Sequence, residues 1–136
     1  MAKKTTETNY SATIIESSRE LTPKERVMFK DLGNANKLND MAEEAFASDA
    51  KAIIDKIKGY VVVSIHNESA ETEDYENYVI LDDAGEKYYT SSKAFWNSFK
   101  SIWDEMKDAD EDWGIQLNLI PSRNYAGKKV LTCSLI

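Results

Sequence analysis

The chain has 136 residues, of which 42% are hydrophobic, and its 24 acidic and 17 basic residues give a formal net charge of −7. This length and composition predict one folded domain that buries a core without disulfides, and they argue against a disordered protein. A single Cys and a single His exclude the common zinc sites, which draw four ligands mainly from these residue types. We therefore expect no metal and no cofactor.

Residues 1–10 contain no apolar segment of the kind found in signal peptides. No stretch of the chain approaches the roughly 18 apolar residues that a membrane span requires. The expected location is the cytoplasm, without membrane association.

Charge is unevenly distributed along the chain. Residues 1–60 carry 10 acids and 10 bases, residues 61–112 carry 14 acids and 4 bases, and residues 113–136 carry 3 bases and no acid. A protein with segregated charge can present a positive groove to a polyanion although it is acidic as a whole. The alternative is that the last strands lack acids because they are mostly buried.

Residues 1–20 are rich in Thr, Ser and Lys and are predicted to form a flexible segment ahead of a single domain over residues 21–136. A short helix should follow, because Thr22 can cap it and Glu25 completes a capping box. Its expected carboxyl end is at Gly33.

Residues 34–50 contain helix-forming residues without a clear apolar stripe. We predict an irregular segment with one helical turn.

Three strands are predicted next, over residues 54–67, 75–83 and 87–90. In the first strand, apolar residues alternate on one face, and Gly59 indicates a bulge or a bend. Gly85 suits a tight connection between the second and third strands. The apolar residues expected to share one face of the first strand are Ile57, Val61, Val63 and Ile65.

A helix is predicted over residues 93–106, capped by Ser91 or Ser92, with a broad aromatic stripe that is typical of a core-facing helix. Two further strands are predicted over residues 113–121 and 128–136. The loop between them runs from Pro121 to Gly127.

The order strand, strand, strand, helix, strand, strand is that of the OB-fold, a five-stranded Greek-key barrel with a helix between strands three and four. We therefore predict a mainly β protein, an OB-like barrel with an amino-terminal helical extension. The alternative is a generic α+β sheet with one packed helix.

If the barrel forms, the loop between its last two strands borders the ligand face. A groove for single-stranded nucleic acid needs cations for the phosphates and flat rings for the bases. Each Tyr could instead reflect strand propensity, and the lysines of the first strand could form a solvated face. The candidate DNA-binding residues are Lys56, Lys58, Tyr60, Tyr78, Tyr88, Arg123, Tyr125, Lys128 and Lys129.

The stretch "GYVVVSIHNES…YENYVILDDAGEKYYTSSKAFWNSFKSIWDEM", followed by "IPSRNYAGKKVLTCSLI", resembles single-stranded DNA-binding proteins of phages that infect Gram-positive bacteria. The resemblance extends over residues 20–136 and includes "LTPKERVMFKD". It implies a protein that coats exposed strands without sequence preference during phage DNA replication or recombination, in the host cytoplasm. It assigns no individual contacts.

Cellular single-stranded DNA-binding proteins end in a flexible acidic tail that recruits partners, whereas this sequence ends in "CSLI". Recruitment by such a tail is therefore in doubt. The resemblance and the strand pattern allow two kinds of protein partner. These are replication proteins and further copies of the chain.

Acidic residues cluster at 71–76 and again at 108–112, but no accompanying base or metal-binding loop suggests catalysis. No Walker or dinucleotide-binding motif occurs, so we expect no enzyme. The first alternative function is an acidic protein-interaction module that mimics DNA and binds a host protein. A second is a barrel that binds one defined oligonucleotide or small ligand without coating long strands.

Overall fold

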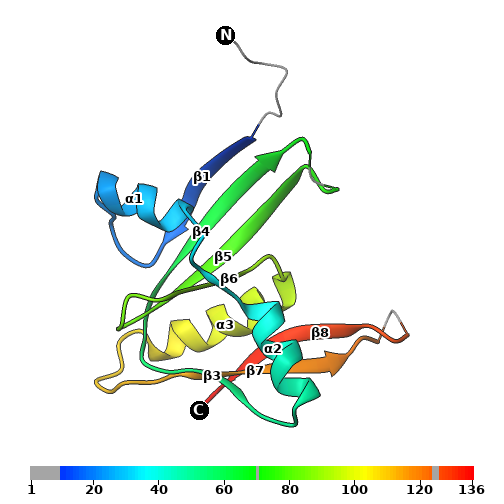
Figure 1. Ribbon diagram of the computed structural model, residues 1–136. Helices are drawn as coiled ribbons and strands as arrows, with labels where there is room; N and C mark the ends of the chain where they lie inside the picture. Colours follow the sequence, from blue (N-terminus) through cyan, green and yellow to red (C-terminus); the bar gives the residue numbers. More distant parts are fainter. Residues whose placement is uncertain (1–9, 70, 124–125) are drawn as a thin grey trace.

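The computed structural model describes residues 10–69, 71–123 and 126–136 (Figure 1). Within these ranges the chain forms eight strands and three helices. Their bounds are β1 Tyr10–Ser17, α1 Pro23–Lys30, β2 Asn36–Lys37, α2 Leu38–Ala47, β3 Ala52–Ile54, β4 Ile57–Asn67, β5 Asp74–Asp82, β6 Lys87–Thr90, α3 Lys93–Met106, β7 Ile115–Pro121 and β8 Lys129–Leu135.

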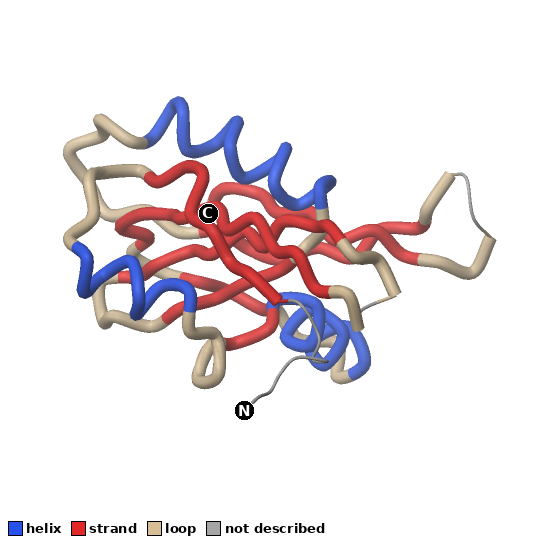
Figure 2. The backbone as a smooth tube through the Cα atoms, turned by 90° about the horizontal axis from the view of Figure 1, so that it is seen from above, coloured by secondary structure: helices blue, strands red, loops and turns tan. Residues whose placement is uncertain are grey.

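The strands form two sheets, one of five strands in the order β1-β4-β5-β6-β2 and one of three in the order β3-β7-β8. Only Asp55 and Lys56 separate β3 from β4, so one bent stretch of chain contributes a strand to each sheet. Lys56 has a positive φ of 51°, which marks the bend. In Figure 2 the strands lie between the long helix α3 and the two shorter helices.

The predicted element order is present as β4, β5, β6, α3, β7 and β8. The predicted closed barrel is not found, because within the described ranges β6 pairs with β5 and β2, while β8 pairs with β7. The protein is therefore mainly β, with two sheets and three helices. In the same part of the chain, none of the helices is long and apolar enough to span a bilayer.

The bulge predicted at Gly59 is confirmed as a register shift between Ile57 and Gly59 in the pairing of β4 with β5. The shift changes the alternation of side chains, since strand residues alternate with a period of two. Ile57 therefore packs with Tyr60 and Val62, and not with Val61 as predicted.

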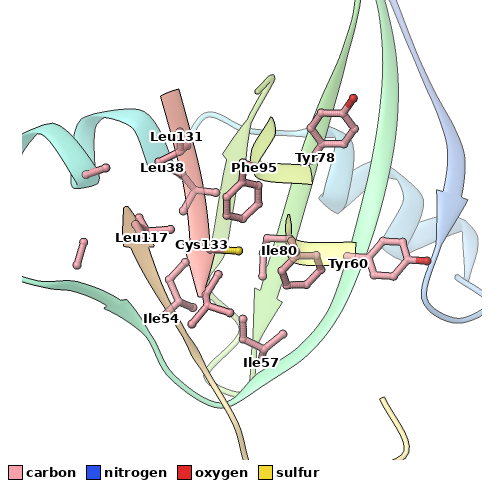
Figure 3. Close-up of a cluster of buried hydrophobic side chains, with 14 of the residues drawn as sticks. Leu38, Ile54, Ile57, Tyr60, Tyr78, Ile80, Phe95, Leu117, Leu131 and Cys133 are labelled. Carbon is pink, nitrogen blue, oxygen red and sulfur yellow. The ribbon is translucent and has the colours of Figure 1, made fainter. Parts of the chain in front are cut away.

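The central strands β4 and β5 carry buried residues on both faces of the five-stranded sheet. The larger core, shown in Figure 3, lies between the two sheets and joins Tyr78 and Ile80 of β5 to Phe95 of α3 and Leu117 of β7. A smaller cluster on the opposite face of β4 contains Val61, with Phe29 and other residues of the segment around α1 packed against it. Tyr60 and Val62, on the face of β4 predicted to meet DNA, are thus core residues.

The helix ends follow local sequence chemistry. The Thr22–Glu25 capping box of α1 is confirmed, and the side chain of Ser92 caps α3 by accepting from the backbone N–H of Phe95. The expectation for Gly33 is wrong, because α1 ends at an extended Asp31, whose carboxylate accepts the Gly33 N–H.

Two segments are more regular than predicted. Residues 10–17 form β1 because alternating Ala12 and Ile14 align with Ile65 and Val63 of β4, a pairing that the Thr- and Ser-rich composition hides. Residues 38–47 form α2 and not an irregular segment. Their stripe of Leu38, Met41, Ala42 and Ala45 is short and built partly from small residues, yet it packs into the larger core.

Candidate nucleic-acid interface

The hairpin that joins β7 to β8 carries the basic residues of the chain's last segment. Its base is closed by the backbone N–H of Ser122, which donates to the carbonyl of Lys128 at 2.9 Å. Gly127 has a φ of 79°, a left-handed conformation that glycine adopts without strain. Arg123, Lys128 and Lys129 are all exposed, so the hairpin presents three cations to solvent.

A cleft of about 290 Å³ lies between this hairpin and α2. Two of its lining residues are cationic and one, Glu43, is anionic. The complete lining is Asn39, Glu43, Leu119, Gly127, Lys128, Lys129 and Leu131. The cleft therefore has a net positive rim although the protein is acidic as a whole.

An exposed aromatic ring adjoins the cleft. Phe46, in the last turn of α2, is 59% exposed, and the Lys129 Nζ lies 4.9 Å from the centre of its ring. Such a cation over an aromatic face is attracted by the ring's quadrupole. The arrangement joins a positive charge and a flat apolar surface at one place.

Tyr60 and Tyr78 were expected on exposed strand faces, and this expectation is wrong. Their exposed fractions are 5% and 1%, and their rings pack against Trp96 of α3. Burial, followed by the hydrogen bond that its hydroxyl donates to Glu76, raises the pKa of Tyr78 to about 12. Burial and a hydrogen bond to Glu16 likewise raise the pKa of Tyr60. Neither ring offers a free face to a base.

Tyr88 is half-buried against the larger core, and its hydroxyl donates to Asp82 at 2.8 Å. Burial, followed by this bond, raises the pKa of Tyr88 to about 12. Tyr88 is therefore a strand residue whose ring packs against the core. The predicted contact at Tyr125 lies outside the described residues.

The structure separates Lys56 and Lys58 from the basic hairpin. The β3 strand just before Lys56 pairs with the Ile115 end of β7, whereas Lys129 pairs with Pro121 at the opposite end. Lys58 forms an exposed ion pair of 3.1 Å with Asp112. The nine predicted residues thus do not form one surface, and Lys128 and Lys129 are the pair that shares a cleft.

Phe46 was missed by sequence reasoning because its segment was predicted to be irregular. Phe46 lies eight residues after Leu38 and four after Ala42, the spacing of the same apolar stripe, so the sequence pattern would place it in the core. Its exposure is seen only in the structure.

No family model, curated protein or solved structure matches the chain.

A second charged cluster lies at the far end of the β4–β5 hairpin. His66 Nδ1 is 2.7 Å from Asp74 and its Nε2 is 3.3 Å from Glu68. These hydrogen bonds, that to Asp74 first, raise the pKa of His66. Potential ligand atoms of His66, Glu73 and Asp74 lie within 4.8 Å of one another. Because both ring nitrogens already contact carboxylates and the group is largely exposed, we interpret it as an ion-pair network.

Proposed function

We propose that this protein binds single-stranded DNA without sequence preference and coats exposed strands during phage DNA replication or recombination. The observation that carries the proposal is the acid-free hairpin with Arg123, Lys128 and Lys129, next to an exposed Phe46. Cations for phosphates combined with aromatic surfaces for bases are the elements of nonspecific single-strand recognition. The resemblance to phage proteins agrees with this reading.

We also propose that the two sheets are an open form of an OB-like barrel. The bent β3–β4 stretch pairs with β7 on one side of the bend and with β5 on the other. This gives the continuous path β8, β7, β3–β4, β5, β6, with α3 between β6 and β7 in the chain. The β7–β8 hairpin then corresponds to the loop that borders the ligand site in OB-folds.

The test replaces all three hairpin cations with glutamine, in the variant R123Q/K128Q/K129Q. The matched control is K24Q/R26Q/K30Q, which removes three exposed cations from α1 and changes the net charge equally. Affinity for oligo(dT) is measured by fluorescence anisotropy at several salt concentrations.

The hairpin variant should bind more weakly, and its slope of log affinity against log salt should be shallower by about 2, at roughly 0.7 per phosphate contact. The control should retain most of the affinity and the slope. Equal losses in both variants would show that net charge, and not the hairpin, determines binding.

The alternative function, an acidic module that mimics DNA, has one observation in its favour. Glu71, Glu73 and Asp74 are exposed at the end of the β4–β5 hairpin, which extends away from the three-stranded sheet (Figure 1). Charge reversal at Glu73, Asp74 and Glu76 should then abolish binding to a basic host protein and leave oligo(dT) binding intact. A wild-type protein without DNA affinity would favour this alternative.

The partner proposals are replication proteins and further copies of this chain, in the cytoplasm of the host. For self-association, β1 is the most suitable surface, since it is an eight-residue strand at the edge of its sheet and Glu16 is its single charged residue. Sedimentation of the wild-type protein and of Thr13→Lys would test this, because a charge on an edge strand opposes pairing.

A further inference from the structure

Phe46 is a large aromatic residue that the packing of α2 leaves exposed to solvent. It carries an exposed fraction of 59%, whereas Leu38 and Ala42 of the same helix are buried and Met41 and Ala45 are partly buried. It belongs to neither hydrophobic core. A large exposed aromatic ring next to a cleft is a common mark of a binding site.

The ring separates two adjoining clefts of different character. On one side, Lys129 lies over the ring and lines the polar cleft of about 290 Å³. On the other side, Phe46 lines a second cleft of about 320 Å³, whose lining residues are mostly apolar in type. The remaining lining residues of this second cleft are Ala42, Ala45, Ala50, Leu117, Asn118, Leu119 and Ile120.

The composition of the second cleft suits a flat apolar group. Three of its lining residues are alanines, so few side chains obstruct access to the ring, and Ile120 at the end of β7 is itself 46% exposed. Among the described residues, no charged side chain lines this cleft. A nucleobase fits this description, because it has two apolar faces and a polar edge.

The positive charges beside the ring favour a ligand that carries a negative charge. Lys128 and Lys129 line the neighbouring cleft, and Arg123 lies on the same hairpin. A base in the second cleft carries its phosphate with it, and these cations would neutralise that phosphate. An uncharged apolar ligand would form no ion pair with these cations.

We propose that Phe46 is a stacking platform for one unpaired nucleobase, which occupies the cleft between Phe46 and Ile120, while Lys129 and Lys128 contact the adjacent phosphate. This inference rests on the proposed function and adds to it the residue that holds a base. It also predicts a preference for single strands, because a base paired in a duplex cannot reach the ring face.

The experiment compares Phe46→Leu and Phe46→Trp with the wild type in anisotropy titrations with labelled oligo(dT). Leucine keeps an apolar side chain and removes the flat ring, whereas tryptophan keeps a ring that can stack. The control is Val27→Ala on α1, where an apolar side chain that is 68% exposed lies outside the proposed site. Thermal unfolding of each variant confirms that it is folded.

Phe46→Leu should weaken binding by about 5- to 150-fold, the range found when one stacked ring is removed. Phe46→Trp should bind as tightly as the wild type, and its additional tryptophan fluorescence should be quenched when oligo(dT) is added. Val27→Ala should leave the affinity unchanged.

Wild-type binding together with an unaffected Phe46→Leu would overturn this inference and leave the proposed function standing. If the wild-type protein does not bind oligo(dT), the proposed function and this inference are both wrong. If Phe46→Trp binds as weakly as Phe46→Leu, stacking is also contradicted, because a variant that keeps an aromatic ring would then have no advantage over one that lacks it.

Discussion

Tyr78 and Trp96 stack face to face, with ring centres 4.9 Å apart and planes inclined by 5°. The contact joins β5 to α3 inside the larger core, so Tyr78 is a core residue. Tyr78→Ala should lower the free energy of unfolding by roughly 3–5 kcal/mol, as for other buried aromatic side chains. Denaturant unfolding would measure the loss.

Tyr78→Phe separates this structural role from DNA binding, because it keeps the ring and removes the hydrogen bond to Glu76. It should cost about 1 kcal/mol of stability and leave the affinity for oligo(dT) unchanged. A folded Tyr78→Phe protein with strongly reduced DNA affinity would restore the earlier interpretation of Tyr78 as a binding residue.

Gly114 lies where the two sheets approach each other. A Cβ at this position would be 2.5 Å from the backbone oxygen of Ile54 and 3.0 Å from the Cα of Asp55. Because both neighbours are backbone atoms, they cannot move aside easily, and Gly114→Ala should destabilise the protein by about 1–3 kcal/mol. Thermal or denaturant unfolding measures this change.

The matched control for this prediction is Gly33→Ala. A Cβ there would meet only the carboxylate oxygen of Asp31, at 3.3 Å, and Gly33 is exposed. The expected change is within about 0.5 kcal/mol. Similar effects at Gly114 and Gly33 would contradict the close approach of β3 to the start of β7.

His66 is the single histidine of the chain, so its titration can be followed without overlap by NMR. Its pKa should lie above the ordinary value of 6.5, and Asp74→Asn should lower it toward that value. Stability from this interaction is fully present below the unfolded pKa and is lost as the pH rises through the folded pKa. Asp104→Asn, on α3, is the control, and an unchanged pKa in Asp74→Asn would disprove the contact.

Glu43 is the single acid that lines the cleft beside the basic hairpin. Its charge opposes a phosphate bound there, so Glu43→Gln should increase affinity for oligo(dT) by about two- to fivefold at low salt, the range expected for an exposed charge pair. Glu44→Gln makes the same change one residue further along α2, outside this cleft. Equal gains in both variants would indicate a general charge effect.

Much of the fold could be predicted from the sequence, because its signals are local. The Thr22–Glu25 capping box and the positive φ of Gly85 depend only on neighbouring residues, and both are confirmed. The strand β1 could not be recognised in this way, because its residues become a strand only by pairing with β4.

The site was harder to predict than the fold. Tyr60 and Tyr78 satisfied the strand pattern, but β4 and β5 carry buried residues on both faces of the sheet, so alternation could not separate core from surface. The bulge at Gly59 added a further error by changing the side on which Ile57 lies. Phe46 came close to Lys129 only through the packing of α2 against β7, which no local signal reports.

We propose that this acidic protein binds single strands through a locally basic surface. The most direct test is an anisotropy titration of the wild-type protein with labelled oligo(dT) and with a duplex of equal length, at two salt concentrations. Binding to oligo(dT) should be detectable and should weaken as salt rises, and binding to the duplex should be much weaker. Absence of binding to either DNA at low salt would contradict this proposal.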